Sequence, residues 1–188
     1  MSKLDRLFVK SYIINEDIEK EFFDCIRDYC YTEEFISTNK NIQHGNITVH
    51  QHIYSVAYIS YKLSKKLGFD YRITARGALL HDLFYYDWHD PDPSHRLHGY
   101  YHPGFALKNA RELSKKVNVE LTEKEENIII RHMFPLTPIP PKYRESILVS
   151  LVDKYVATKE IFICRSPALK KRLENRIENM RSEYLDNI

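Results

Sequence analysis

Residues 76–90 read RGALLHDLFYYDWHD and contain the dipeptide His-Asp twice. The first pair, His81-Asp82, closes an apolar run whose spacing predicts a buried helix. A carboxylate at the buried end of a helix costs free energy unless it is paired or bound to a metal ion. The second pair, His89-Asp90, precedes a proline in a polar stretch that is typical of a loop. The first pair is therefore the one that requires a chemical explanation.

Other polar side chains break apolar helical faces in the same way. His52 lies on the apolar stripe of a helix predicted over residues 48–67, and His132 follows two isoleucines on the inward face of its helix. Asp153 interrupts the apolar stretch SILVSLVDKYVA, and His102 directly precedes the start of another predicted helix. These positions predict one shared site, because helical proteins build metal sites from side chains on facing helices.

The chemistry of this set points to transition metals. Imidazole suits Fe, Mn, Zn, Co and Ni, whereas Mg²⁺ and Ca²⁺ prefer ligands that are all oxygen. Six protein ligands are too many for one ion that must also bind water and a substrate. A carboxylate can bridge two ions. We therefore predict two divalent transition-metal ions per chain.

The composition limits the class of protein. The chain has 188 residues, 43% hydrophobic and 29% charged, which fits one globular domain with a sizeable core. A formal net charge of +2 gives no general case for a nucleic-acid or acidic-membrane partner. The sequence shows no signal-peptide pattern and no membrane-spanning run. Three cysteines without a C-x-x-C pair favour a cytoplasmic location.

Long stretches with a 3.6-residue period and only five glycines predict an all-α protein, a single helical bundle with the metal site between helices. Capping boxes at Thr48 and Thr122 mark two helix starts. Residues 85–101 break every periodicity and predict a long loop, of a kind that is often functional. The expected helices cover residues 16–33, 48–67, 70–83, 103–117, 122–133, 141–163 and 167–185.

The order of these residues resembles the pattern of the HD-domain superfamily of metal-dependent phosphohydrolases: a histidine, then His-Asp, then two histidines, then an aspartate. The resemblance covers roughly residues 45–160. It divides the chain into an N-terminal helical segment (1–44) that packs on the core, the HD domain (45–163), and a C-terminal helix of the same domain (164–188). The matching segments are TVHQHIYSVAYIS with His52, GALLHDLF with His81 and Asp82, YYHPGFALKNA with His102, IIIRHMFP with His132, and VSLVDKYVA with Asp153.

The resemblance implies how the ligands are shared between two ions. One ion would be held by His52, His81, Asp82 and Asp153. Members with the two extra histidines hold a second ion through His102 and His132, with Asp82 bridging.

The chain departs from the family where many members follow the His-Asp pair with Ile-Gly-Lys, because Leu83-Phe84-Tyr85 stands there instead. A phosphate contact by that lysine cannot be assumed. The basic residues that could replace it are Lys154, Arg76, Arg131 and Arg96.

Further site residues are predicted near the His-Asp pair. Asp82 is a predicted catalytic residue. Asp87 is similar in its spacing to the acidic residues that orient the attacking water in some nucleotidase members, although it could also be a solvated loop carboxylate. Trp88 could stack on a base or simply pack over the core. We predict His98 to contact substrate or support His102 rather than bind metal, because prolines and a glycine around it argue against a helix.

The expected activity is hydrolysis of a phosphoester by metal-activated water, with a small nucleotide-like substrate as the partner. Oligomers are possible. One alternative is an HD-type di-iron oxygenase acting on a small alcohol or phosphonate, which uses nearly the same ligands. Another is a metal-binding sensor or scaffold without enzymatic activity.

Overall fold

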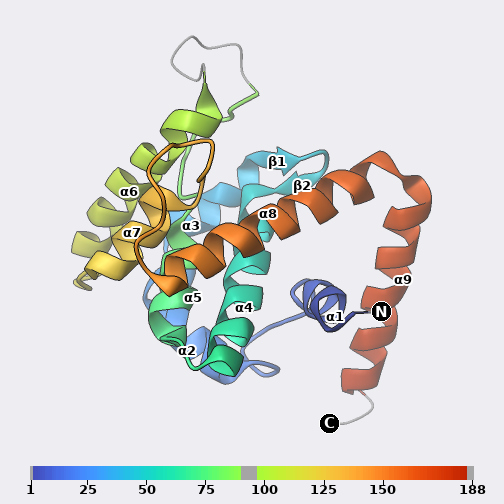
Figure 1. The fold of residues 1–188 in the computed structure, drawn as a ribbon. Coiled ribbons are helices and arrows are strands. Elements are labelled where there is room, and N and C mark those ends of the chain that lie inside the picture. The colour runs from blue at the N-terminus through green and yellow to red at the C-terminus, as the bar shows by residue number, and fades with distance from the viewer. Residues whose placement is uncertain (1, 90–96, 186–188) are drawn as a thin grey trace.

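The computed structural model describes residues 2–89 and 97–185 of the chain, and its architecture is a helical bundle with one short hairpin (Figure 1). The prediction of an all-α protein is confirmed. The described helices are α1 (Lys3–Lys10), α2 (Lys20–Cys30), α3 (Glu33–Ser37), the 3₁₀ turn η1 (Thr38–Lys40), α4 (Val49–Leu67), α5 (Tyr71–Leu80), α6 (His98–Lys116), α7 (Glu123–Arg131), α8 (Arg144–Arg165) and α9 (Pro167–Leu185). The strands β1 (Ile42–His44) and β2 (Ile47–Thr48) pair antiparallel.

Local sequence signals account for the helix limits that position the site. Thr48 and Gln51 form the predicted capping box at the start of α4, and Gly68 ends that helix in the left-handed conformation with φ 68°. Thr122 and Glu125 form the second predicted capping box, at the start of α7. These caps fix where the α4 and α7 histidines fall relative to the core.

Three expected limits were wrong. The predicted helix 16–33 is two helices, α2 and α3, with Thr32 capping the second. The helix after Asp70 stops at Leu80, so that the His-Asp pair follows its end. The helix expected from Pro103 begins at His98. Pro103 is tolerated in its second turn because the missing amide removes one intrahelical hydrogen bond and leaves the others in place.

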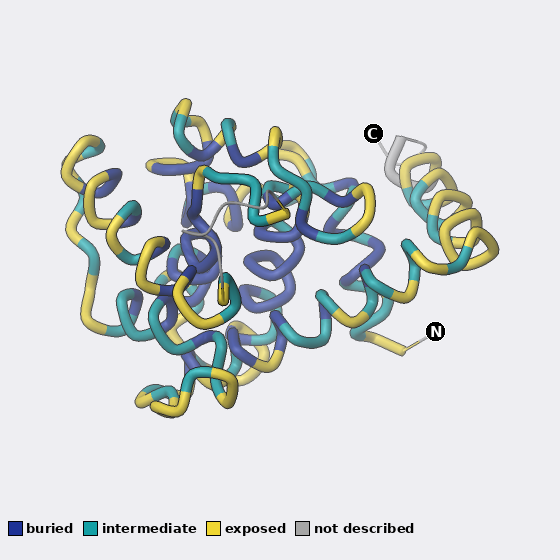
Figure 2. Tube along the Cα trace, turned by 90° about the horizontal axis from the view of Figure 1, so that it is seen from above, coloured by how far each residue is buried: buried dark blue, intermediate teal, exposed yellow. Residues whose placement is uncertain are grey.

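Helix α4 runs through the middle of the bundle, where it packs against α5 and α8. Helix α7 packs in turn against α5, α6 and α8. Figure 2 shows the buried residues gathered in the interior, with exposed residues on the outer turns. Most of the large buried side chains are apolar, and the six predicted ligands form a buried polar group among them. The fold therefore places this group between the helices, as the sequence predicts.

The two ends of the chain pack onto this bundle. Phe8 of α1 and Phe22 of α2 belong to the buried core, and α9 lies against α8 and α1 (Figure 1). The predicted division at residues 44 and 163 stays a prediction. None of the described helices combines the length and the hydropathy that a lipid bilayer requires of a spanning segment.

Candidate metal centre

The six predicted ligands lie together and are buried, with exposed fractions between 0% and 7%. They come from five different segments of the bundle, which is why the site exists only in the folded chain. His52 is on α4, His81 and Asp82 follow the end of α5, His102 is on α6, His132 follows the end of α7, and Asp153 is on α8.

The backbone fixes the tautomer of three imidazoles. A main-chain carbonyl only accepts hydrogen bonds, so a ring nitrogen that contacts one must carry the hydrogen. Each of these three rings donates from Nδ1 and leaves the lone pair of Nε2 directed toward the other ligands. The pairs are His81 Nδ1 with the Ala78 carbonyl at 2.7 Å, His102 Nδ1 with that of His98 at 2.9 Å, and His132 Nδ1 with that of Ile129 at 2.8 Å.

The two oxygens of Asp82 face different groups of ligands. Oδ1 lies 3.1 Å from Nε2 of His102 and 3.3 Å from Nε2 of His132. Oδ2 lies 3.6 Å from Nε2 of His81 and 3.8 Å from Nε2 of His52. This placement is the one that a carboxylate bridging two cations would need.

Asp153 completes the second of these groups. Its Oδ1 lies 3.2 Å from Nε2 of His52 and 3.7 Å from Nε2 of His81. Three His and Asp side chains, His52, His81 and Asp153, thus present ligand atoms to one another, as do His81, Asp82 and His132.

The electrostatics of the group are those of a buried charge network. Burial opposes the charged form of His52 and His81, yet the carboxylates around them raise the pKa of both rings. At Asp82 the rings of His81, His102 and His132 outweigh burial, and at Asp153 those of His52 and His81 do so. The pKa of both carboxyls is therefore held below its usual range. Burial lowers the pKa of His132. Protons on the rings therefore balance negative charge that metal ions could balance instead.

The residues present fit a pair of divalent cations. Two buried atoms that face the centre, Nε2 of His81 and Oδ1 of Asp82, have no hydrogen-bond partner among the described residues. Unprotonated imidazole nitrogens and carboxylate oxygens are the ligands that transition-metal ions prefer. A buried polar atom without a partner is costly, and a bound cation would satisfy both atoms.

A cleft of about 860 Å³ leads to this group. Asp82, His102 and Asp153 line it, so the site is open to a small molecule. The residues that line the cleft include both apolar and polar side chains. The apolar residues are Trp88, Met133, Pro135, Leu136 and Ala157, and the polar residues besides the ligands are Gln43, His44, His98 and Lys154.

Three of the predicted substrate contacts line this cleft, and each is already held by the protein. The His98 ring stacks on His102, with 4.6 Å between centroids and 19° between planes, because the two residues are one helical turn apart on α6. The helix does include His98, so the prediction against a helix there was wrong. Trp88 stacks on His98 at 5.2 Å and 14°. His98 therefore stands beside the predicted ligand His102, and Trp88 contacts His98.

Lys154 lines the cleft, but its ammonium group has other partners. Nζ donates to the main-chain carbonyl of His132 at 2.8 Å, and to the carbonyl and hydroxyl of Ser150 at 3.2 and 2.9 Å. Burial lowers the pKa of this lysine. A phosphate contact by Lys154 stays a prediction and would have to replace one of these bonds.

Other predicted contacts are not brought to the cleft. The Asp87 carboxylate accepts hydrogen bonds from the amide and Nδ1 of His89, both at 2.9 Å, at the surface. Arg76 pairs with the buried Glu125 at 2.9 Å. Arg131 is half-buried and does not line the cleft. Arg96 lies outside the described residues.

The structure adds neighbours that sequence reasoning missed. Gln43 of β1 donates to Oδ2 of Asp82 at 3.0 Å, and Glu160 of α8 contacts Nδ1 of His52 at 2.8 Å. Glu160 stands seven residues after Asp153, a spacing that puts both on one helix face, and this signal could have found it. Nothing in the sequence pattern marks Gln43.

The fold and the site together define a helical metal-binding domain. The family model described as HD domain matches residues 49–158, which is more than half of the chain, and the chain therefore belongs to the HD-domain family. HD domains bind divalent metal ions and belong to a metal-dependent, hydrolase-like class of proteins. No curated protein and no solved structure matches the chain significantly.

Proposed function

We propose that this protein is a metal-dependent phosphohydrolase that cleaves a small phosphoester and uses two divalent ions. The observation that carries the proposal is the position of Asp82. Its two oxygens face two separate imidazole groups, and the residue also lines the open cleft. Substrate can therefore reach the one carboxylate that both ions would share. Paired divalent ions bridged in this way are suited to in-line displacement at phosphorus.

When bound, the ions would activate water and offset the negative charge on the phosphoryl oxygens. The protein's own part is to hold the ligand atoms in place. The three backbone-bonded imidazoles cannot rotate without breaking their Nδ1 bonds. In the reaction, the oxygen of water forms a bond to phosphorus, the bond from phosphorus to the alcohol oxygen breaks, and the alcohol leaves with a proton.

The cleft also supports a substrate class. Trp88, Met133 and Leu136 offer an apolar surface for the alcohol part of the ester. Among the described residues that line the cleft, Lys154 is the one lysine or arginine, and its ammonium is already bonded to protein oxygens. This lining suits one phosphate on an apolar or aromatic group, such as a nucleoside monophosphate, better than a triphosphate.

A substrate screen tests the proposal. Metal-free protein would be reloaded separately with Mn²⁺, Co²⁺, Zn²⁺ and Fe²⁺ and assayed for phosphate release from p-nitrophenyl phosphate and from nucleoside mono- and triphosphates. Dinucleotides would be assayed by their nucleotide products. Turnover that depends on the metal and is lost in Asp82→Ala is the expected result. No turnover of any ester by fully loaded protein would contradict the proposal.

A di-iron oxygenase is a second candidate, and Lys154 is the observation that favours it. The ammonium group of Lys154 already donates hydrogen bonds to protein oxygens, so it offers little charge to a bound phosphate. A small alcohol would not need a cation at this place. The two candidates differ in what they consume. An oxygenase would hold iron after aerobic purification and take up oxygen with its substrate, and a hydrolase would not take up oxygen.

A further inference from the structure

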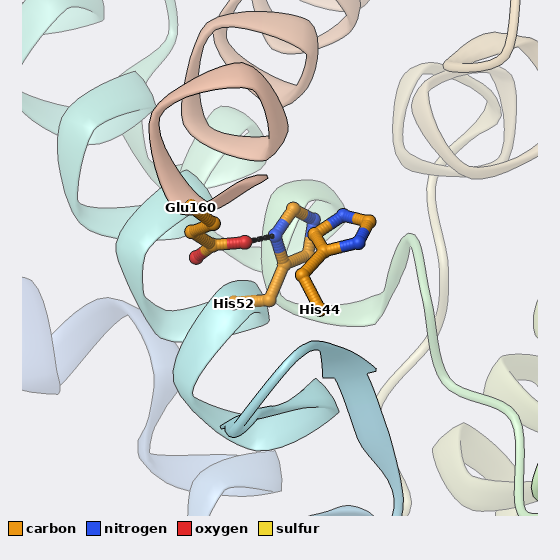
Figure 3. A group of neighbouring side chains, drawn as sticks. All are labelled: His44, His52 and Glu160. Atoms are coloured by element: carbon orange, nitrogen blue, oxygen red, sulfur yellow. Dashed lines mark hydrogen bonds and ion pairs between the residues drawn. The ribbon is translucent and has the colours of Figure 1, made fainter. Parts of the chain in front are cut away.

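Glu160 is a buried carboxylate whose role the predicted ligand set does not explain. It stands on α8 and has an exposed fraction of 0%. Its Oε2 lies 2.8 Å from Nδ1 of His52, the hydrogen bond drawn in Figure 3. Its other oxygen, Oε1, is buried without a hydrogen-bond partner among the described residues. An ionised carboxylate that is buried and only half satisfied needs compensating positive charge nearby.

Among the described residues, the neighbours of His52 provide only part of that charge. The opposite nitrogen of the ring, Nε2, faces Asp153 at 3.2 Å and Asp82 at 3.8 Å. Three carboxylates therefore surround one imidazole. Protons on His52 and on the neighbouring His81 could balance at most two of them. A divalent cation at Nε2 would balance two of the three carboxylates without any extra ring proton, and the Nδ1 hydrogen of the neutral His52 ring would then be donated to Glu160.

His52 differs in this respect from the other three histidines of the set. Their Nδ1 hydrogens go to neutral main-chain carbonyls, whereas that of His52 goes to a carboxylate. A carboxylate behind an imidazole raises the basicity of its other nitrogen and fixes the orientation of the ring. The ligands on the His52 side of Asp82 thus have a source of affinity that His102 and His132 lack.

We infer that Glu160 is a positioning residue that makes the two metal positions unequal. The position formed by His52, His81 and Asp153 binds its ion more tightly than the position formed by His102 and His132, and it fills first. The inference rests on the metal centre of the proposed function but not on the reaction that the centre catalyses.

His44 offers a rival explanation, because His44, His52 and Glu160 could together hold an ion of their own (Figure 3). The His44 ring stands at 90° to that of His52, with 5.9 Å between centroids. An ion there would need the lone pair of His52 Nδ1. In the inferred arrangement, that nitrogen donates its hydrogen to Glu160 at 2.8 Å and so has no lone pair for an ion.

A stepwise metal titration tests the inference. Metal-free wild type, Glu160→Gln and Glu145→Gln would be titrated with Co²⁺, with calorimetry and the visible spectrum of the ion as readouts. Glutamine keeps the size of the side chain and an acceptor oxygen but removes the charge. Glu145 is the matched control, since it is also a buried carboxylate on α8 but bonds to the Asp70 amide and Lys124 instead.

Wild type should bind two ions in two distinguishable steps. Glu160→Gln should weaken the first step about 10–100-fold, the usual effect of losing a group that supports a metal ligand, and should change the Co²⁺ spectrum of that step. The second step and the Glu145→Gln control should match wild type. Equal steps in wild type, an unchanged first step in Glu160→Gln, or an equal loss in both variants would each overturn the inference.

A second measurement needs no variant, in case Glu160→Gln does not fold. Nitrogen-15 NMR of Zn²⁺-loaded wild type reports which ring nitrogen of His52 carries hydrogen. We expect hydrogen on Nδ1, and a bare Nδ1 would overturn the inference. Failure of the proposed function is separate, because a protein that binds Zn²⁺ but hydrolyses no ester leaves this result intact.

Discussion

Nε2 of His102 and Nε2 of His132 lie 2.8 Å apart in the core of the bundle, while Nδ1 of each ring is bonded to a main-chain carbonyl. If both rings are neutral, two lone pairs face each other at hydrogen-bond distance. Either a proton or a cation must lie between them. The adjacent Oδ1 of Asp82, at 3.1 Å from His102, makes a cation the better fit.

Metal ions should therefore stabilise the folded chain. A ligand that binds only the folded state adds about 2.7 kcal/mol to the free energy of unfolding at a free concentration of 100 Kd. For a chain of this size, that is a rise in Tm of about 5–10 °C. Calorimetry with Mn²⁺, Co²⁺ or Zn²⁺ against the chelator-treated protein measures it. A Tm that none of these ions changes would contradict the presence of a metal ion at these rings.

The two His-Asp pairs should respond differently to mutation. Asp82→Ala removes the carboxylate between the imidazole groups, so we expect loss of metal retention and of activity. His89→Ala changes a ring that is 45% exposed and bonded to Asp87 at the surface, so metal content should stay at the wild-type level. Elemental analysis of both purified variants decides. Metal lost from the His89 variant and kept by the Asp82 variant would reverse the assignment.

Much of the fold could be predicted because its helix limits are encoded locally. The capping boxes at Thr48 and Thr122 and the glycine at position 68 act within a few residues of themselves. The start of α6 could not be predicted, because Pro103 is a poor helix former inside a helix, whereas in the folded chain it is buried within α6. Helix propensities depend on the residue type and do not include tertiary packing.

The predicted ligand set could be found because each member is polar in an apolar pattern. Glu160 was missed because its immediate neighbours Thr158 and Lys159 are polar, although it lies seven residues after Asp153 on the same helix face. Only its contact with His52, 108 positions away in the chain, shows what it does. Asp87 and Arg76 are the opposite case, because they were predicted to lie in the site and do not line the cleft. Their residue types suit a site, but sequence spacing does not say where a loop carboxylate or a long side chain points.

Lys154→Met distinguishes a structural lysine from a phosphate-binding one. The structure gives its ammonium bonds to the His132 carbonyl and to Ser150, so we expect the free energy of unfolding to fall by about 1–3 kcal/mol, with KM nearly unchanged. Lys159→Met is the control on the same helix, since Lys159 pairs with Asp5 instead. A large rise in KM without loss of stability would identify Lys154 as a phosphate contact.

The stabilisation by metal should increase with pH. In the metal-free protein the pKa values of His52 and His81 are raised above 6.5, so their contribution to stability is complete below 6.5 and is lost as pH rises through the folded values. Metal ions must displace these protons, so their affinity rises over the same range. The difference in Tm between loaded and metal-free protein should be larger at pH 8 than at pH 6. A difference that does not depend on pH would show that no protons are displaced.

The count of metal ions in freshly purified protein tests the central claim most directly. The six buried ligands form two groups that share Asp82, and a family of metal-binding domains covers residues 49–158. Protein purified without chelators and analysed for Fe, Mn, Zn, Co and Ni should contain about two ions per chain, the number that one bridging carboxylate allows. One ion per chain at saturating metal would contradict the shared centre, and none would contradict the whole account.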